Sequence, residues 1–470
     1  MSNRQDWLLA LSKAMETLEA WEERFTPASV RSPGTRDQDT LNDLALRMHG
    51  NYPFGSPDYA GQMLKPPDPV AWAAVALAML VNPNNHALDG GPPTAAMERE
   101  AVAELAGLFG FSADGRPWLG HLTASGTIAN LEALWVAREV TRSPDGHIRG
   151  VAASASAHYT HQRVSGVLGI PFFTLPTTAD ADIDVDALPH FLASHDVGTV
   201  VVTLGATGTG RVESLHKVIP ICRAAGVRIH VDAAYGGFFR LLAELNPPQV
   251  ANEQAFLATG LADSLVVDPH KHGLQPYGCG CVLFADPAVG RVYVHDSPYT
   301  YFTGNELHLG EISLECSRAG AAAAGLWATL QAVGLRGPGS LTERLSLGRS
   351  AALQWNAALK SSDWFCPLVE PDTDILVFAP RHPDGRALLA SEISAVSTRV
   401  FERGMCSADG ALFLARMRWP VDRLPASMNM QADVSEVQVL RSVLMKPEHA
   451  THWPGLNARL HVLVQRAFAE

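Results

Sequence analysis

Lys271 follows a short aliphatic run, residues 265–267, that is typical of a buried strand. Asp268 and a proline end this run, so His270 and Lys271 lie just beyond the end of the strand. Desolvation lowers the pKa of a lysine among apolar residues, and the neutral amine can then form a Schiff base. A surface lysine beside a turn would have the same local sequence, so Lys271 alone does not decide between these interpretations.

Ser125, Gly126 and Thr127 lie in the stretch LTASGTIAN, which is typical of a strand running into a helix. Free backbone N–H groups, the positive end of a helix dipole and two hydroxyl groups could bind a phosphate there. The same residues could equally form an ordinary helix N-cap that binds nothing.

Asp232 ends another apolar run, in HVDAAYGGF, and small residues follow it. Lys271 comes 39 residues later, at the end of another predicted strand. A carboxylate at a strand end is often structural, but it can also pair with a cationic ligand.

These stretches, together with SAHYTHQRVSGVLGI at 156–170, resemble in order and spacing the pyridoxal 5'-phosphate (PLP) enzymes of fold type I. Asp-Pro-His-Lys at 268–271 resembles the group II amino-acid decarboxylases, and GQMLKPP and NPNNHALDGGP resemble their bacterial tyrosine-decarboxylase-like branch. The resemblance covers most of the chain and is strongest between 122 and 271. It implies α-decarboxylation of an L-amino acid, either aromatic such as tyrosine or acidic such as aspartate or glutamate.

The resemblance also assigns roles to individual residues. Lys271 would carry PLP as a Schiff base, and Asp232 would pair with the protonated pyridine nitrogen. His158 would stack on the ring opposite Ala234, whereas nothing in the motif supports a role for His161. The expected cofactor-binding residues are Ser125, Gly126, Thr127, His158, Thr207, Asp232, Ala234, His270 and Lys271.

In the resembled family, the segment after residue 295 is a mobile loop in which one tyrosine returns a proton to the substrate carbon. Tyr299 matches that position best, and Tyr301 is the second candidate. A tyrosine there favours simple decarboxylation. The alternative for either residue is an aromatic side chain docked on the surface.

Substrate-binding residues are expected outside these motifs. Arg416 and Arg418 lie two apart on a predicted strand, and Arg416 is the better candidate for reaching a substrate carboxylate. A surface salt bridge is the alternative. Tyr59 is a further candidate substrate contact, with a surface aromatic as the alternative.

The elements around these residues predict an α/β fold. Seven short apolar runs between 117 and 284 alternate with helical or loop segments, which predicts a mostly parallel sheet covered by helices on both faces. Ligands in such sheets bind at the carboxyl ends of the strands. After residue 366 the pattern predicts a strand, a helix, a strand and a final helix over 434–444.

We therefore expect three parts: an N-terminal helical and loop segment (1–90) packed on a partner subunit, a large PLP-binding α/β domain (91–360) and a small α+β C-terminal domain (361–470). The resemblance implies a homodimer with the active site at the interface.

Composition narrows the function classes. The formal charge of −12 argues against nucleic-acid binding. The six cysteines form no CxxC pair, so neither a metal site nor a disulfide framework is expected. The N-terminus is typical of an amphipathic helix rather than a signal peptide, and the apolar run 70–81 is too short to span a bilayer. A cytoplasmic enzyme with no membrane partner is expected.

Three other functions remain open. An aldehyde synthase or a carbon–carbon lyase would keep the cofactor residues and change the loop and pocket. An aminotransferase fits the Asp-Pro-His-Lys setting poorly. A non-catalytic interaction protein would have no need to keep Lys271, Asp232 and His158 together.

Overall fold

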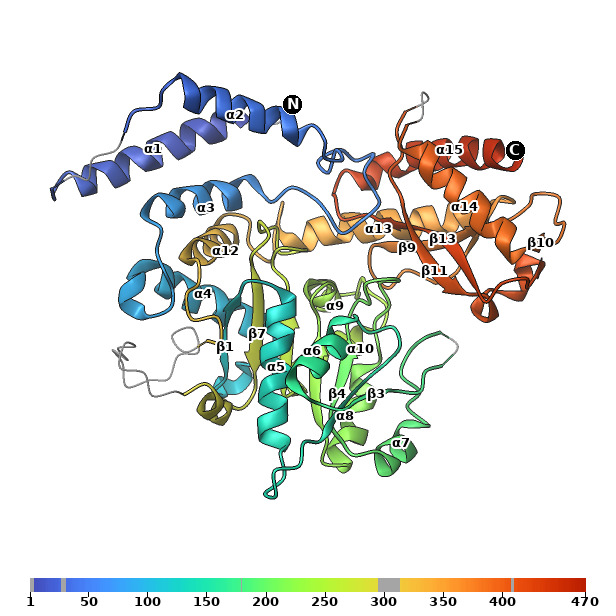
Figure 1. The fold of residues 1–470 in the computed structure, drawn as a ribbon, viewed down its shortest axis with the longest axis horizontal. Coiled ribbons are helices and arrows are strands. Elements are labelled where there is room, and N and C mark those ends of the chain that lie inside the picture. Colours follow the sequence, from blue (N-terminus) through green and yellow to red (C-terminus); the bar gives the residue numbers. More distant parts are fainter. Residues whose placement is uncertain (1–3, 27–30, 179, 295–312, 407–409) are drawn as a thin grey trace.

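A seven-stranded sheet forms the centre of the molecule (Figure 1), seen in a computed structural model that describes residues 4–26, 31–178, 180–294, 313–406 and 410–470. The strand order is β1-β7-β6-β5-β4-β2-β3, with β7 antiparallel to both of its neighbours and the other pairs parallel. The strands are β1 (Leu119–Thr123), β2 (Gly150–Ala153), β3 (Phe172–Thr174), β4 (Val197–Thr203), β5 (Arg228–Asp232), β6 (Ser264–Val267) and β7 (Gly280–Phe284). Each coincides with a predicted apolar run, so the mostly parallel α/β sheet is confirmed.

Helices cover both faces of this sheet because successive strand residues point to opposite sides. Leu265 and Val267 of β6 pack into one hydrophobic cluster with α4, α8 and α12. Val266, between them, packs with α5 on the other face. The helices of the large sheet region are α4 (Pro92–Phe109), α5 (Gly126–Thr141), α6 (Thr160–Leu168), α7 (Leu188–Ser194), α8 (Leu215–Ala224), α9 (Arg240–Ala243), α10 (Glu253–Leu257) and α12 (Gly320–Ala332).

The C-terminal part has its own four-stranded antiparallel sheet, in the order β11-β13-β9-β8. The long helix α13 (Leu341–Lys360) leads into it, and α14 (Ala390–Gly404) and α15 (His449–Phe468) pack against it (Figure 1). Its strands are β8 (Phe365–Pro367), β9 (Ile375–Pro380), β11 (Ala415–Pro420) and β13 (Glu436–Val443), and a two-residue pair, β10 (Leu388–Leu389) with β12 (Met430–Gln431), lies beside it.

The predicted helix over 434–444 is wrong, because these residues form β13. Val437, Val439 and Val443 are β-branched and buried, as suits a strand held between β9 and β11. Leu440 points to the opposite face and is also buried, so both faces of the strand are covered. The sequence therefore lacks the strict alternation of apolar and polar residues that identifies a strand, and its apolar spacing resembles that of a helix. The final helix is α15, which the sequence pattern did not predict.

Among the described residues, three α-helices precede α4. They are α1 (Arg4–Glu22), α2 (Thr35–Met48) and α3 (Pro69–Val81), of which α2 was not predicted. Neither α1 nor α2 contains a buried residue, and Figure 1 shows both lying outside the rest of the fold. No helix in the described ranges is both long enough and apolar enough to cross a membrane.

Candidate active site

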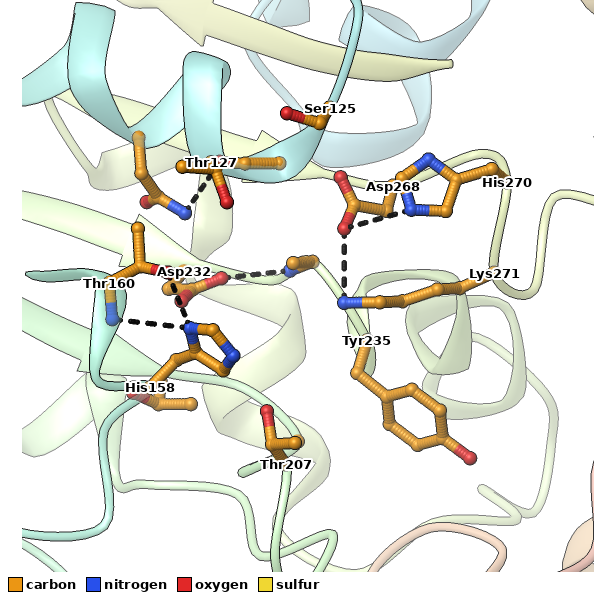
Figure 2. A pocket seen from close by; sticks show the side chains of 15 residues that line it. Ser125, Thr127, His158, Thr160, Thr207, Asp232, Tyr235, Asp268, His270 and Lys271 are labelled. Carbon is orange, nitrogen blue, oxygen red and sulfur yellow. Dashed lines mark hydrogen bonds and ion pairs between the residues drawn. The ribbon is translucent and has the colours of Figure 1, made fainter. Parts of the chain in front are cut away.

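One cavity of about 200 Å³ lies where the carboxyl ends of β4, β5 and β6 face the start of α5 (Figure 2). All nine residues that were predicted from the sequence to bind the cofactor line this cavity. The complete lining is Ser125, Gly126, Thr127, Asn130, His158, Thr160, Thr203, Gly205, Thr207, Asp232, Ala234, Tyr235, Asp268, His270 and Lys271. The structure therefore brings together segments that are up to about 150 residues apart in sequence.

The start of α5 forms one wall of the cavity. Ser125 is the N-cap, and its hydroxyl accepts a hydrogen bond from the N–H of Ile128 at 3.3 Å. Thr127 is exposed to the cavity. Gly126 lies against Asp268, and a Cβ atom at position 126 would come within 2.5 Å of Asp268 Oδ1. Only glycine therefore lets the helix terminus approach this carboxylate.

Asp232 is held by hydrogen bonds to both of its carboxylate oxygens. His161 Nε2 donates to Oδ2 at 2.8 Å, and the N–H of Ala234 donates to Oδ1 at 3.1 Å. Burial raises the pKa of Asp232, but the hydrogen bond and charge of His161 and the charge of Lys271 outweigh burial and hold this pKa below its usual range. Asp232 is therefore ionised at neutral pH.

His161 is the main site residue that the sequence reasoning missed. It is fully buried on α6 and does not line the cavity, yet it is the direct partner of Asp232. The only sequence signal was its place three residues after His158 in the same motif, and only the tertiary contact between α6 and the end of β5 identifies its partner.

Lys271 and Asp268 face one another across the turn that follows β6 (Figure 2). Lys271 Nζ lies 3.0 Å from Asp268 Oδ2, and His270 Nε2 lies 3.5 Å from the same oxygen. The other oxygen, Oδ1, is buried and has no hydrogen-bond partner among the described residues. Among the described residues, only one of the two carboxylate oxygens of Asp268 therefore has a partner.

His158 has one ring nitrogen occupied by its own chain. Its Nδ1 accepts a hydrogen bond from the N–H of Thr160 at 3.3 Å and lies 2.7 Å from the hydroxyl of that residue. A neutral ring then carries its proton on Nε2. Burial lowers the pKa of His158, with a smaller opposing effect from Asp232, so the neutral ring is favoured.

The predicted substrate residues lie outside the cavity. Tyr59 is buried among aromatic rings that include Phe413, so the surface alternative for it is wrong. Arg416 turns toward α14, where it donates to the Thr398 hydroxyl at 2.9 Å and lies 4.5 Å from the Phe401 ring. The geometry of this chain gives no support to substrate binding by either residue.

A different arginine reaches the cavity wall. Arg441 is buried on β13 and donates to the carbonyl oxygens of Thr207 and Gly208 at 2.7 and 2.9 Å and to Gln62 Oε1 at 3.0 Å. It therefore holds the loop that carries Thr207. It was overlooked because β13 was assigned as a helix. Tyr299 and Tyr301 lie outside the described residues.

The groups around the cavity fit PLP. A helix terminus with two hydroxyl groups suits a phosphate, an ionised carboxylate suits a protonated ring nitrogen, and a lysine amine suits an aldehyde. The unpartnered buried Oδ1 of Asp268 also indicates that the site is completed by a bound group.

Comparison with known proteins gives the same picture. The model of the pyridoxal-dependent decarboxylase conserved domain matches residues 53–363, which include every residue that lines the cavity. An L-tyrosine decarboxylase of Enterococcus faecium is 28% identical, over 68% of this chain and 69% of the relative. A probable L-aspartate decarboxylase of Halobacterium salinarum is 32% identical, over 58% and 70%.

A crystal structure of Oryza sativa TDC with PLP and tryptamine has the same fold, with a TM-score of 0.77 over 98% of this chain and 99% of that chain, at 18% identity. The family match covers most of this chain and includes the whole cavity. The chain therefore belongs to the pyridoxal-dependent decarboxylases, and it is a PLP-dependent amino-acid decarboxylase.

Proposed function

We propose that this chain releases the α-carboxylate of an L-amino acid as CO2 and yields the primary amine, with PLP attached covalently to Lys271. The observation that carries the proposal is the meeting of the Lys271 amine, the ionised Asp232 and the start of α5 at one cavity. When bound, PLP supplies an aldehyde for amines and a ring that accepts the electron pair of the bond that breaks.

Asp232 supplies a fixed negative charge in a buried place. Because His161 and Ala234 bond its two oxygens, the carboxylate cannot turn away or take up a proton at neutral pH. Asp232 would hold a protonated ring nitrogen and favour its cationic form, which is the condition for drawing electrons away from the substrate.

Asp268 and His158 have two further roles, which are to accept a proton from Lys271 and to present a fixed ring to the cavity. A lysine must lose a proton before its amine can attack, and Asp268 Oδ2, 3.0 Å from Nζ, is positioned to accept that proton. His158 presents its flat ring to the cavity with Nδ1 engaged by Thr160, so the ring orientation is set before ligands bind.

The lining favours an uncharged aromatic substrate such as tyrosine over aspartate or glutamate. A side-chain carboxylate would need a cation of its own, and Lys271 is the sole lysine or arginine among the described residues that line the cavity. Amine products measured over the common amino acids test this choice. Turnover of acidic amino acids with none of tyrosine would overturn it.

Tyr299 is proposed, from the resemblance, as the acid that returns a proton to the substrate carbon. A phenol held over a dry site can donate that proton by position. Tyr299→Phe should shift the products from amine toward aldehyde, with Tyr301→Phe as the matched control. An unchanged product ratio for Tyr299→Phe would remove that role, and aldehyde from the wild-type chain would favour an aldehyde synthase.

The proposed division of the chain is an N-terminal segment (1–90), a large domain (91–360) and a small domain (361–470). The proposed partner of the N-terminal segment is a second copy of the chain. The helices α1 and α2 expose apolar side chains to solvent, which a monomer would not keep uncovered. These side chains are Leu8, Leu9, Trp21, Leu41, Leu44, Leu46 and Met48. Molar mass by light scattering, for the intact chain and for Leu41→Glu with Leu44→Glu, tests this homodimer.

Attachment at Lys271 is tested directly by borohydride reduction of the holoenzyme followed by peptide mass mapping. The cofactor mass should appear on the peptide that contains Lys271 and on no other. A label on a different lysine, such as Lys65 or Lys446, would overturn the proposal.

A further inference from the structure

Asp374 is a buried carboxylate that the chemistry above does not use. It immediately precedes β9 in the C-terminal sheet and is 1% exposed. The hydroxyl of Tyr235 donates to its Oδ1 at 2.5 Å, and His272 Nε2 lies 3.4 Å from its Oδ2. One carboxylate thus contacts two residues of the large domain.

Both residues that contact Asp374 lie in or next to the wall of the cavity. Tyr235 lines the cavity three residues after Asp232, while its ring packs in the core of the C-terminal part with Ile375 and Val377. His272 follows Lys271 directly, and its ring packs edge-on against the Tyr235 ring with 4.8 Å between centroids. The Asp232 segment and the Lys271 turn therefore meet at Asp374.

The charge state of this group is defined. Burial raises the pKa of Asp374, but His272 and Tyr235 outweigh burial and hold it below its usual value. Burial also raises the pKa of Tyr235, so its hydroxyl stays protonated and acts as the donor of the hydrogen bond to Asp374. The charge of Asp374 in turn raises the pKa values of Lys65, Arg441 and His449, which are lowered by burial.

The fold contains a second group of the same chemistry away from the cavity. The Tyr293 hydroxyl donates to Glu132 Oε2 at 3.0 Å, and His121 Nε2 lies 3.0 Å from the same oxygen. All three side chains are buried, and none of them lines the cavity. This group is a matched control for a buried tyrosine–carboxylate–histidine cluster.

We propose that Asp374 is a positioning residue of the decarboxylase site, which holds the Asp232 segment through Tyr235 and the Lys271 turn through His272. The inference rests on the proposed roles of Lys271 and Asp232. It predicts that a change in the C-terminal sheet, outside the cavity, weakens cofactor binding, because a site loses affinity when its supporting contacts loosen.

The test measures the apparent dissociation constant of PLP from refilled apoprotein, by fluorescence quenching and by the absorbance of the bound cofactor. Asp374→Asn keeps the shape and loses the charge, and it should weaken PLP binding about tenfold. Tyr235→Phe should weaken it in the same direction. The double variant should bind PLP no more weakly than Asp374→Asn alone, because both changes act on the same Tyr235–Asp374 hydrogen bond.

Glu132→Gln and Tyr293→Phe are the controls, and they should lower Tm while PLP affinity stays within about twofold of wild type. The inference is overturned if Asp374→Asn binds PLP like wild type, or if Glu132→Gln weakens binding equally. If Asp374→Asn does not fold, Tyr235→Phe decides alone by the same criterion. A wild-type chain that carries no label on Lys271 would instead overturn the proposed function.

Discussion

Two carboxylates at the ends of neighbouring strands line the same cavity, and the protein treats them differently. Asp232, the last residue of β5, has hydrogen bonds from His161 and Ala234 to both oxygens. Asp268, after β6, has Lys271 beside one oxygen and no partner for the other among the described residues. The protein alone therefore fixes the charge of Asp232, whereas the environment of Asp268 changes with the state of Lys271 and with what binds.

Lys271→Ala should have the largest effect, because it removes the attachment point and the partner of Asp268 together. We expect amine production to fall at least about a thousandfold, with no cofactor label after borohydride reduction. Lys217→Ala, at a lysine outside the cavity, serves as the control. Substantial turnover by Lys271→Ala would contradict the proposed attachment.

Asp232→Asn should have the next largest effect. At saturating PLP, kcat should fall about a hundredfold, because a neutral amide cannot stabilise a cationic ring. Asp268→Asn should lower kcat less and should mainly slow cofactor attachment, measured as the rate of absorbance change when PLP is added. Equal losses of kcat in the two variants would remove the distinction between these carboxylates.

His161→Gln should lower activity about tenfold and should move acid unfolding to higher pH. The folded pKa of Asp232 is lowered, so its contribution to stability is present above the unfolded pKa and is lost as pH falls through the folded pKa. Without His161 the folded pKa rises toward the unfolded value, so Asp232 contributes less stability at neutral pH and the loss is complete at a higher pH, which moves the acid midpoint upward. Circular dichroism against pH measures the midpoint, and His190→Gln, at an exposed histidine, should leave it in place.

Gly126→Ala should have the smallest effect and should act through Asp268. The new Cβ would meet both Asp268 oxygens at 2.5 to 2.6 Å, so we expect a loss of about 1–3 kcal/mol of stability with weaker PLP binding. Gly166→Ala in α6 is the matched control, since its Cβ would meet nothing within 4 Å, and it should be neutral or stabilising. Equal thermal shifts in the two variants would show that Asp268 does not crowd position 126.

The cavity walls were predictable from the sequence because each is a local feature. An aliphatic run followed by a turn residue marks the end of a strand, and parallel strands bring such ends to one edge of the sheet. Ser125, Asp232 and Lys271 could therefore be predicted as site residues without knowledge of their contacts, and the structure places all three at one cavity.

The partners of those residues depended on the tertiary structure. His161 meets Asp232 across 71 residues, and Tyr235 meets Asp374 across 139. No local pattern encodes such pairs, because they depend on how helices and sheets pack. Residues 436–443 make the same point at the level of an element. Their apolar residues suit a helix or a strand covered on both faces, and pairing with β9 and β11 satisfies the backbone hydrogen bonds that make them a strand.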